Sequence, residues 1–133
     1  MRYLLDTNVC VDYLTGRHPP VIARVQAASP ADMGVSSVVV AELRYGADKS
    51  KHKKRNHDLL DALLAEIRCL DFNAGAARAF GRIRAALEKR GESIGPYDTM
   101  IAAHALDLDG VLVTDNVKEF ERVKGLRLEN WRL

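Results

Sequence analysis

An α/β domain with a central, mainly parallel β-sheet flanked by helices is predicted by three features of the sequence. Short apolar runs alternate along the chain with segments whose apolar residues recur at helical spacing. Two of these runs, residues 3–5 and 111–114, lead into an acidic and a polar residue, as buried strands do where they open into a helix. The 133 residues are 47% hydrophobic and 29% charged, which suits one core in one domain over residues 1–133.

The individual elements follow from periodicity and from capping residues. Pro19, Pro20 and Pro96 mark helix starts, Asn73 is an expected N-cap, and Gly91 marks a helix end. Ser37 is the expected N-cap of a helix whose three valines also favour a strand. The expected strands are residues 2–5, 31–36, 69–72, 111–114 and 126–128. The expected helices are residues 9–14, 19–29, 38–47, 59–67, the segment between 73 and 91, the segment from 96, and 117–122.

Four acids have positions that suggest a shared site. Asp6 and Asp115 end strands, while Glu42 and Asp98 lie on the inward faces of expected helices. The carboxyl ends of parallel strands meet at one edge of a sheet, where ligands bind in open α/β folds. Each helical acid also has an ordinary interpretation: Glu42 as a surface acid, and Asp98 as a first-turn residue that stabilises its helix.

Carboxylates a few ångströms apart repel one another unless a cation is bound, and hard oxygen ligands suit Mg²⁺ or Mn²⁺. No His or Cys lies at a spacing typical of zinc sites. A carboxylate-held Mg²⁺ is most useful in phosphoryl chemistry, because it activates water and stabilises the leaving oxygen. His104 is expected on another face of its helix, as a surface or packing residue.

The charge distribution favours a polyanionic partner. The net charge is +2, but if the four acids are set aside, 20 Lys and Arg face 14 remaining acids, so the rest of the molecule carries +6. Residues 49–57 hold five Lys or Arg and no acid. Such a run is usually the solvent-exposed start of a helix. The more specific alternative is that it contacts an RNA backbone.

No apolar run is long enough to cross a membrane, and Asp6 interrupts the only candidate signal sequence. Cys10 and Cys69 are far apart and are expected to be free thiols of a cytoplasmic protein.

Four motifs, taken in their order and spacing, resemble those of PIN-domain nucleases, and most closely the VapC toxins of bacterial toxin–antitoxin modules. Each motif alone is weak, but the set spans nearly the whole chain. The motifs are Leu5-Asp6-Thr7-Asn8, Ala41-Glu42-Leu43, residues 96–105 around Asp98, and residues 113–120 around Thr114-Asp115-Asn116.

The resemblance implies a three-layer α/β/α PIN fold and assigns roles by position. Asp6, Glu42 and Asp98 would be acidic metal-site residues, and Thr114 and Asn8 would support the site. The fourth position falls on Asn116, with Asp115 one residue early, so either Asn116 serves as a neutral ligand or Asp115 supplies the charge.

For function, the resemblance implies a Mg²⁺-dependent endoribonuclease, often acting on tRNA or rRNA and leaving a 5′-phosphate and a 3′-hydroxyl. It also implies a homodimer that is inhibited by a VapB-type antitoxin, whose C-terminal segment covers the site.

Other functions fit the sequence less well. A haloacid-dehalogenase-type phosphatase needs a second Asp two residues after the first, where this chain has Asn8. A receiver domain needs an acidic pair after its first strand, and only Asp6 is present. A non-catalytic RNA- or partner-binding domain on the same fold would leave the acids without a task, and without a metal they would repel a phosphate backbone.

Overall fold

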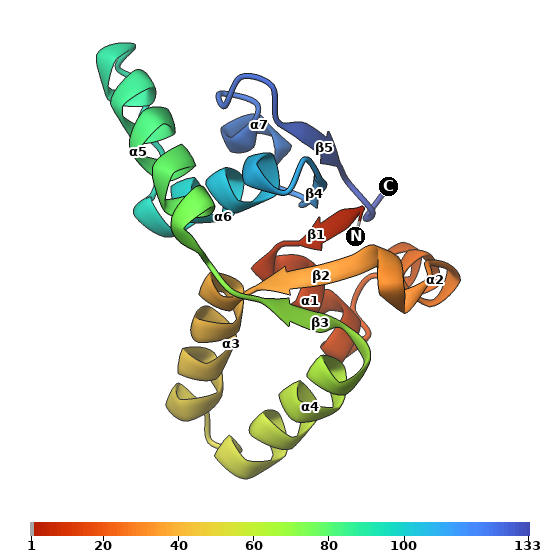
Figure 1. Cartoon of the computed structure of the whole chain (residues 1–133). Helices are drawn as coiled ribbons and strands as arrows, with labels where there is room; N and C mark the ends of the chain where they lie inside the picture. The colour runs from red at the N-terminus through yellow and green to blue at the C-terminus, as the bar shows by residue number, and fades with distance from the viewer. Residues whose placement is uncertain (1) are drawn as a thin grey trace.

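The computed structural model describes residues 2–133 and contains one five-stranded sheet in the order β3-β2-β1-β4-β5 (Figure 1). All four strand pairs are parallel, and β1 occupies the centre between β2 and β4. The strands are β1 (Tyr3–Leu5), β2 (Met33–Ser36), β3 (Arg68–Leu70), β4 (Val111–Val113) and β5 (Arg127–Glu129). The predicted sheet is therefore confirmed, and it is wholly parallel.

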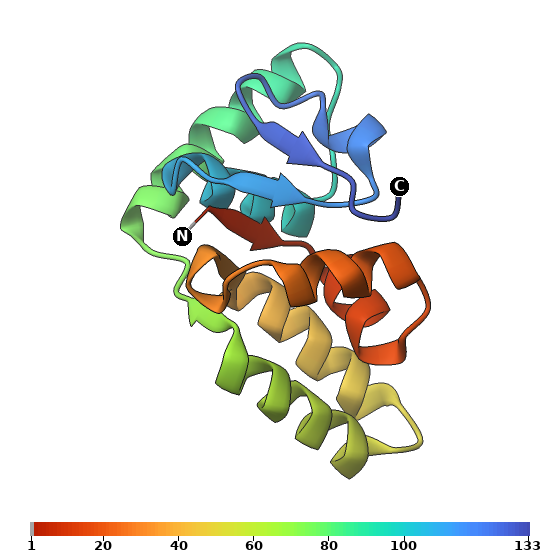
Figure 2. The same cartoon turned by 90° about the vertical axis from the view of Figure 1, so that its right-hand side faces the viewer.

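Helices connect the strands and cover the sheet. Both views place α3 beside α4 as a hairpin and α5 beside α6 at the other end of the molecule (Figures 1 and 2). The helices are α1 (Thr7–Thr15), α2 (Pro19–Ala27), α3 (Ser37–Lys49), α4 (Lys53–Glu66), α5 (Ala74–Lys89), α6 (Pro96–Asp107) and α7 (Val117–Phe120). The strands predicted to alternate with helices do so throughout the described chain.

One hydrophobic core holds these layers together. Leu4 and Leu112 from neighbouring central strands are fully buried, and Phe120 and Trp131 from the C-terminal segment pack into the same core. Helix α6 is buried along Ile101–Ala105, so its small side chains let the helix lie close to the sheet. This close packing fixes the start of α6, where Asp98 lies.

Several predicted boundaries were wrong by one to three residues. Residues 30–32 form a 3₁₀ turn rather than the start of β2, because Pro30 favours a turn. The N-cap of α3 is Ser36, whose hydroxyl accepts a hydrogen bond from the Val38 amide, while the Ser37 hydroxyl accepts one from Phe72. Strands β3 and β5 are displaced by one residue, and α7 is shorter than expected.

His104 is a packing residue and not a surface residue. Its side chain is buried, its ring lies edge-on to Phe72, and Nδ1 is 2.8 Å from the Ser36 hydroxyl. The two cysteines are free thiols, with Cys10 buried and Cys69 exposed. Among the helices of residues 2–133, none has both the length and the apolar character required to cross a bilayer.

Candidate functional site

Asp6 lies at the carboxyl end of the central strand and caps the helix that follows. Its side chain is only 5% exposed, and it accepts hydrogen bonds from the Thr7 amide at 2.8 Å and from the Thr114 hydroxyl at 2.7 Å. The register Leu5↔Val113 brings Thr114 to this position from the neighbouring strand. Burial raises the pKa of Asp6, and these two hydrogen bonds oppose the rise by stabilising the carboxylate.

Glu42 reaches the same edge from α3. Its Oε1 accepts a hydrogen bond from the Thr7 hydroxyl at 3.0 Å, so Thr7 links the start of α1 to α3. The side chain is half-buried, as expected for an acid beside a buried stripe. Its charge contributes to the raised pKa values of both Asp6 and Asp98, so the predicted approach of these three acids is realised.

Asp98 is in the first turn of α6 and has the most perturbed pKa of the group. The pKa of Asp98 is raised to about 7, first by burial and then by the negative charges of Asp6, Glu119 and Glu42, with a hydrogen bond to Glu119 acting in the same direction. A carboxyl group with this pKa is half-protonated near neutral pH. Its raised pKa therefore reflects burial together with the negative charge of the neighbouring acids.

Glu119 is a fourth acid at this edge that the sequence analysis did not single out. It lies on α7, where its Oε2 accepts a hydrogen bond from the Asn116 side chain at 2.5 Å and its Oε1 one from the Gly95 amide at 3.4 Å. Asn116 thus presents its amide nitrogen to Glu119. The sequence did contain a signal for this contact: positions 116 and 119 are three residues apart, which puts them on one side of a helix.

These four side chains (Asp6, Glu42, Asp98 and Glu119) are called the acid cluster below. Within residues 2–133, no Lys or Arg forms an ion pair with any of them. Nor does any group of three His, Cys, Asp or Glu in that span converge tightly enough to form a ready-made metal site. The cluster is thus a set of oxygen ligands with uncompensated charge.

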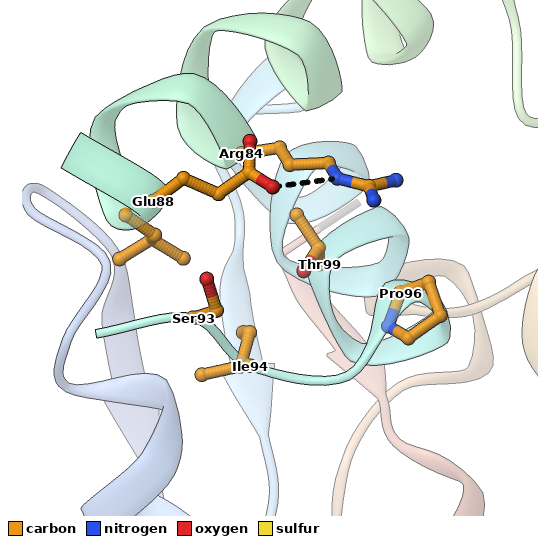
Figure 3. A pocket seen from close by; sticks show the side chains of 7 residues that line it. Arg84, Glu88, Ser93, Ile94, Pro96 and Thr99 are labelled. Atoms are coloured by element: carbon orange, nitrogen blue, oxygen red, sulfur yellow. Dashed lines mark ion pairs between the residues drawn. The ribbon is translucent and has the colours of Figure 1, made fainter. Parts of the chain in front are cut away.

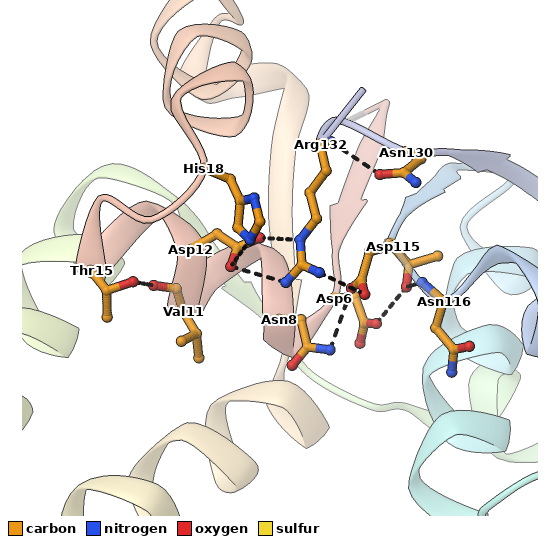
Figure 4. A network of polar contacts seen from close by, with 11 residues as sticks. Asp6, Asn8, Val11, Asp12, Thr15, His18, Asp115, Asn116, Asn130 and Arg132 are labelled. Atoms are coloured by element: carbon orange, nitrogen blue, oxygen red, sulfur yellow. Dashed lines mark hydrogen bonds and ion pairs between the residues drawn. The ribbon is translucent and has the colours of Figure 1, made fainter.

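Asp115 lies near enough to Asp6 for its charge to raise the pKa of that acid, but its own hydrogen bonds form a second set of contacts (Figure 4). Arg132 donates to Asp115 Oδ2 at 3.0 Å and forms two hydrogen bonds to Asp12, at 2.7 and 3.1 Å. Asp12 is only 3% exposed, and Asn8 donates to Asp115 Oδ1 at 3.3 Å. These residues (Asp12, Asp115 and Arg132) are called the arginine bridge below.

Sequence reasoning missed Asp12 and Arg132 for different reasons. Asp12 interrupts the apolar run of α1, and a buried acid in such a run requires a partner, so a signal was present. Arg132 follows 120 residues later, near the end of the chain, and no local pattern distinguishes it.

A small cavity of about 70 Å³ lies apart from the acid cluster (Figure 3). It is bounded by α5, including the Arg84–Glu88 ion pair at 3.7 Å, and by Ser93, Ile94 and Pro96 of the segment that leads into α6. A space of this size holds a few waters rather than a substrate. The cavity is therefore part of the packing around the start of α6.

Comparison with known proteins identifies the family. The PIN-domain family model matches residues 3–126. Ribonuclease VapC2 of Rickettsia felis is 42% identical over 133 residues, with 98% of each chain covered. The chain belongs to the VapC ribonucleases of the PIN-domain family. The tRNA(fMet)-specific endonuclease VapC of Shigella flexneri is 40% identical over 131 residues, again with 98% of each chain covered.

Solved structures of VapC-containing complexes have the same fold as this chain. VapBC from Salmonella typhimurium, bound to DNA, matches with a TM-score of 0.93 at 37% identity and covers 98% of both chains. VapBC2 from Rickettsia felis, bound to a fragment of promoter DNA, matches with a TM-score of 0.91 at 38% identity, covering 98% of this chain and 99% of that one. The three-layer PIN fold implied by the motifs is therefore confirmed.

Proposed function

We propose that this VapC-family chain is the endoribonuclease toxin of a type II toxin–antitoxin system. It would cleave RNA, with tRNA or rRNA as the substrate class, and so inhibit translation and growth. The relatives named as ribonucleases and as a tRNA(fMet)-specific endonuclease support this activity. The observation that carries the proposal is the acid cluster, four carboxylates at the carboxyl edge of the sheet without a balancing cation.

The acid cluster fits a hard divalent cation. All of its donors are oxygens. Burial first, and the neighbouring negative charges second, raise the pKa values of Asp6 and Asp98, and a bound cation would stabilise their ionised forms against both effects. We propose Mg²⁺, with Mn²⁺ as a substitute, because these ions take carboxylate ligands and retain water. When bound, the ion would supply an activated water and stabilise the leaving oxygen of the phosphodiester.

The residues of the site divide into ligands and supports. Asp6, Glu42 and Asp98 would hold the ion, and Asn116 would contribute at the fourth position, with Glu119 fixing its amide. The Thr114 hydroxyl donates a hydrogen bond to Oδ2 of Asp6, and the Thr7 amide donates one to Oδ1. These two bonds fix the orientation of the Asp6 carboxylate. Asn8 supports Asp115, whose charge is engaged by Arg132, so we assign Asp115 a positioning role.

Catalysis by the chain's own groups is then mainly a matter of orientation. The hydrogen bonds from Thr7 to both Asp6 and Glu42 limit the motion of two ligands at once. Asp98 must lose its proton to bind a cation, so with a pKa of about 7 the proton and the ion compete for its carboxylate near neutral pH. A fixed arrangement of ligands keeps the nucleophile and the phosphodiester in line and lowers the barrier.

The partners follow from the family. The solved VapBC complexes support a VapB-type antitoxin as the inhibitor, and we propose that this chain forms a homodimer within a larger toxin–antitoxin assembly. We further propose that residues 1–133 act as one PIN domain in the cytoplasm.

The test is cleavage of tRNA(fMet) and of total RNA by the purified chain, with Mg²⁺, with Mn²⁺ and with EDTA. Cleavage is expected with either metal and not with EDTA. Asp6→Asn and Asp98→Asn should each reduce the rate by more than roughly 100-fold, since even supporting residues around metal ligands contribute 10- to 100-fold. Asp58→Asn, the same change at an exposed acid on α4, is the matched control and should retain the rate.

Three results would contradict the proposal. Cleavage that persists in EDTA would exclude a metal-dependent reaction. Full activity of Asp98→Asn would remove the acid cluster from the mechanism, and binding of RNA without any cleavage would favour a non-catalytic domain.

A further inference from the structure

Two exposed tyrosines border a groove that opens beside the acid cluster. The groove has a volume of about 700 Å³, and its walls include Tyr45 of α3, Tyr97 of α6, and both Thr7 and Glu42 of the site. Tyr45 is 66% exposed and Tyr97 is 60% exposed, which makes them two of the most exposed large hydrophobic side chains in residues 2–133. Aromatic rings left in water beside a proposed active site require an explanation.

The positions of these tyrosines follow those of the acids. Tyr45 is three residues after Glu42 and so lies on the same side of α3, while Tyr97 directly precedes Asp98 in the first turn of α6. A ligand seated between the rings would therefore be adjacent to whatever the acids hold. The rest of the groove is lined mainly by the apolar side chains of Val38, Ala41 and Met100.

We propose that this groove binds the unpaired nucleotide next to the scissile phosphate, with its base against Tyr45 and Tyr97. The inference rests on the proposed ribonuclease function, because the acid cluster defines where the scissile phosphate lies. Stacking of bases on aromatic side chains is a general means of holding single strands, and it needs a base that is free of its own helix. The groove is also large enough for such a ligand, since drug-sized molecules occupy about 300–1,000 Å³.

A positive charge just outside the groove, behind Tyr45, fits the same occupant. The Lys49 ammonium lies 5.8 Å from the centre of the Tyr45 ring, one turn further along α3 than Tyr45. A base stacked on Tyr45 would place its neighbouring phosphate within reach of this cation. The groove thus offers an acidic end for a metal-bound phosphate and an apolar middle for a base, with Lys49 beside Tyr45 for the next phosphate.

The inference is tested by binding and not by cleavage. The probes are a fluorescein-labelled oligonucleotide of eight adenosines and the matching oligonucleotide of eight abasic ribose phosphates, both titrated by anisotropy in EDTA. The ratio of the two affinities measures the contribution of the bases to binding, because repulsion between the phosphates and the acids affects both probes equally. The native chain should bind the adenosine probe roughly tenfold more tightly, as expected for stacking of one or two bases.

Variants test whether the rings of Tyr45 and Tyr97 cause the preference for the adenosine probe. Tyr45→Ala and Tyr97→Ala should each reduce the ratio at least threefold, whereas Tyr45→Phe and Tyr97→Phe, which keep the ring, should retain it. Leu59→Ala is the matched control, because Leu59 is another exposed large apolar residue, 38% exposed, outside this groove.

The outcomes separate this inference from the proposed function. A ratio of one in the native chain, or an unchanged ratio in both Ala variants, would overturn the stacking groove even if RNA were cleaved. Dissociation of a dimer into monomers by Tyr45→Ala or Tyr97→Ala, measured by sedimentation, would also overturn it, because a second copy would then cover the rings. Failure of cleavage with the ratio intact would contradict only the proposed function.

Discussion

The acid cluster and the arginine bridge lie at the same edge of the sheet, but they differ in whether their negative charge is paired with a cation of the chain. In the arginine bridge, Arg132 forms ion pairs with both the buried Asp12 and the neighbouring Asp115. In the acid cluster, four carboxylates share no Lys or Arg within residues 2–133, and the pKa of Asp98 rises to about 7. Acids that pair with an arginine of the same chain serve the structure, whereas acids that have no such partner are available for a cation from outside.

The comparison also distinguishes Asp115 from Asn116. Asp115 is one residue early for the fourth family position, and its two carboxylate oxygens are engaged by Arg132 and Asn8. Asn116 faces the acid cluster through Glu119. The neighbours in sequence therefore belong to different networks, and variants of each network should behave differently.

The largest expected effect on stability comes from Arg132→Ala. This change removes the cation from Asp12, which stays buried, and such a loss typically costs about 3 kcal/mol; partial exposure of Arg132 reduces the expected value to about 2 kcal/mol. Urea denaturation of both proteins at pH 7.5 measures the difference. Arg78→Ala, at an exposed arginine on α5, is the matched control and should change the free energy of unfolding by less than about 0.5 kcal/mol.

Equal stability of the Arg132 and Arg78 variants would contradict the structural role of the arginine bridge. The double variant Asp12→Asn with Arg132→Ala sharpens the test. Since it removes the orphaned charge as well as the cation, it should be more stable than Arg132→Ala alone.

A smaller effect of opposite sign is expected in the acid cluster. The pKa of Asp98 in the folded chain is about 7 and lies above the ordinary value of 3.8, so between these pH values the folded state holds a proton that the unfolded chain has lost. The stability contributed by this proton is fully present below pH 3.8 and is lost as the pH rises to about 7. Without metal, Asp98→Asn should therefore be more stable than the native chain at pH 8, by about 1 kcal/mol once the effect of the shift is reduced for the partial exposure of Asp98 to solvent.

The measurement is urea denaturation in EDTA at pH 5 and at pH 8. The native chain should lose more stability than Asp98→Asn between these pH values, because only the native chain ionises Asp98. Addition of Mg²⁺ at pH 8 should then stabilise the native chain more than the variant. Identical pH profiles would show that Asp98 carries no excess of negative charge.

The sequence predicted the fold well because the relevant signals are local. Pro96 at the start of α6, Asn73 as the cap of α5 and the apolar strand before Asp6 all became the expected elements. The boundary errors at β2 and β3 arose where strands are only three or four residues long, since periodicity over so few residues gives little information.

The candidate site was predicted only where local pattern and parallel topology were sufficient. Asp6, Glu42 and Asp98 approach one another because strand ends and inward helix faces meet at one edge. Arg132 could not be found in this way, since its contact with Asp12 joins residues 120 positions apart through the packing of the C-terminal segment. Without that contact, the sequence could not show that Asp115 was already engaged.

The smallest expected effect is that of Asp115→Asn, and it tests the division between the two networks most directly. An amide at this position keeps an oxygen for Arg132, and Arg132 keeps both bonds to Asp12, so the free energy of unfolding should fall by less than about 1 kcal/mol. RNA cleavage should stay within a fewfold of the native rate. Asn116→Ala should reduce cleavage more, because it frees the Glu119 carboxylate from the hydrogen bond that holds it. If Asp115→Asn instead abolished cleavage, as expected for Asp98→Asn, Asp115 would belong to the metal site, and Arg132 would have to release it when the ion binds.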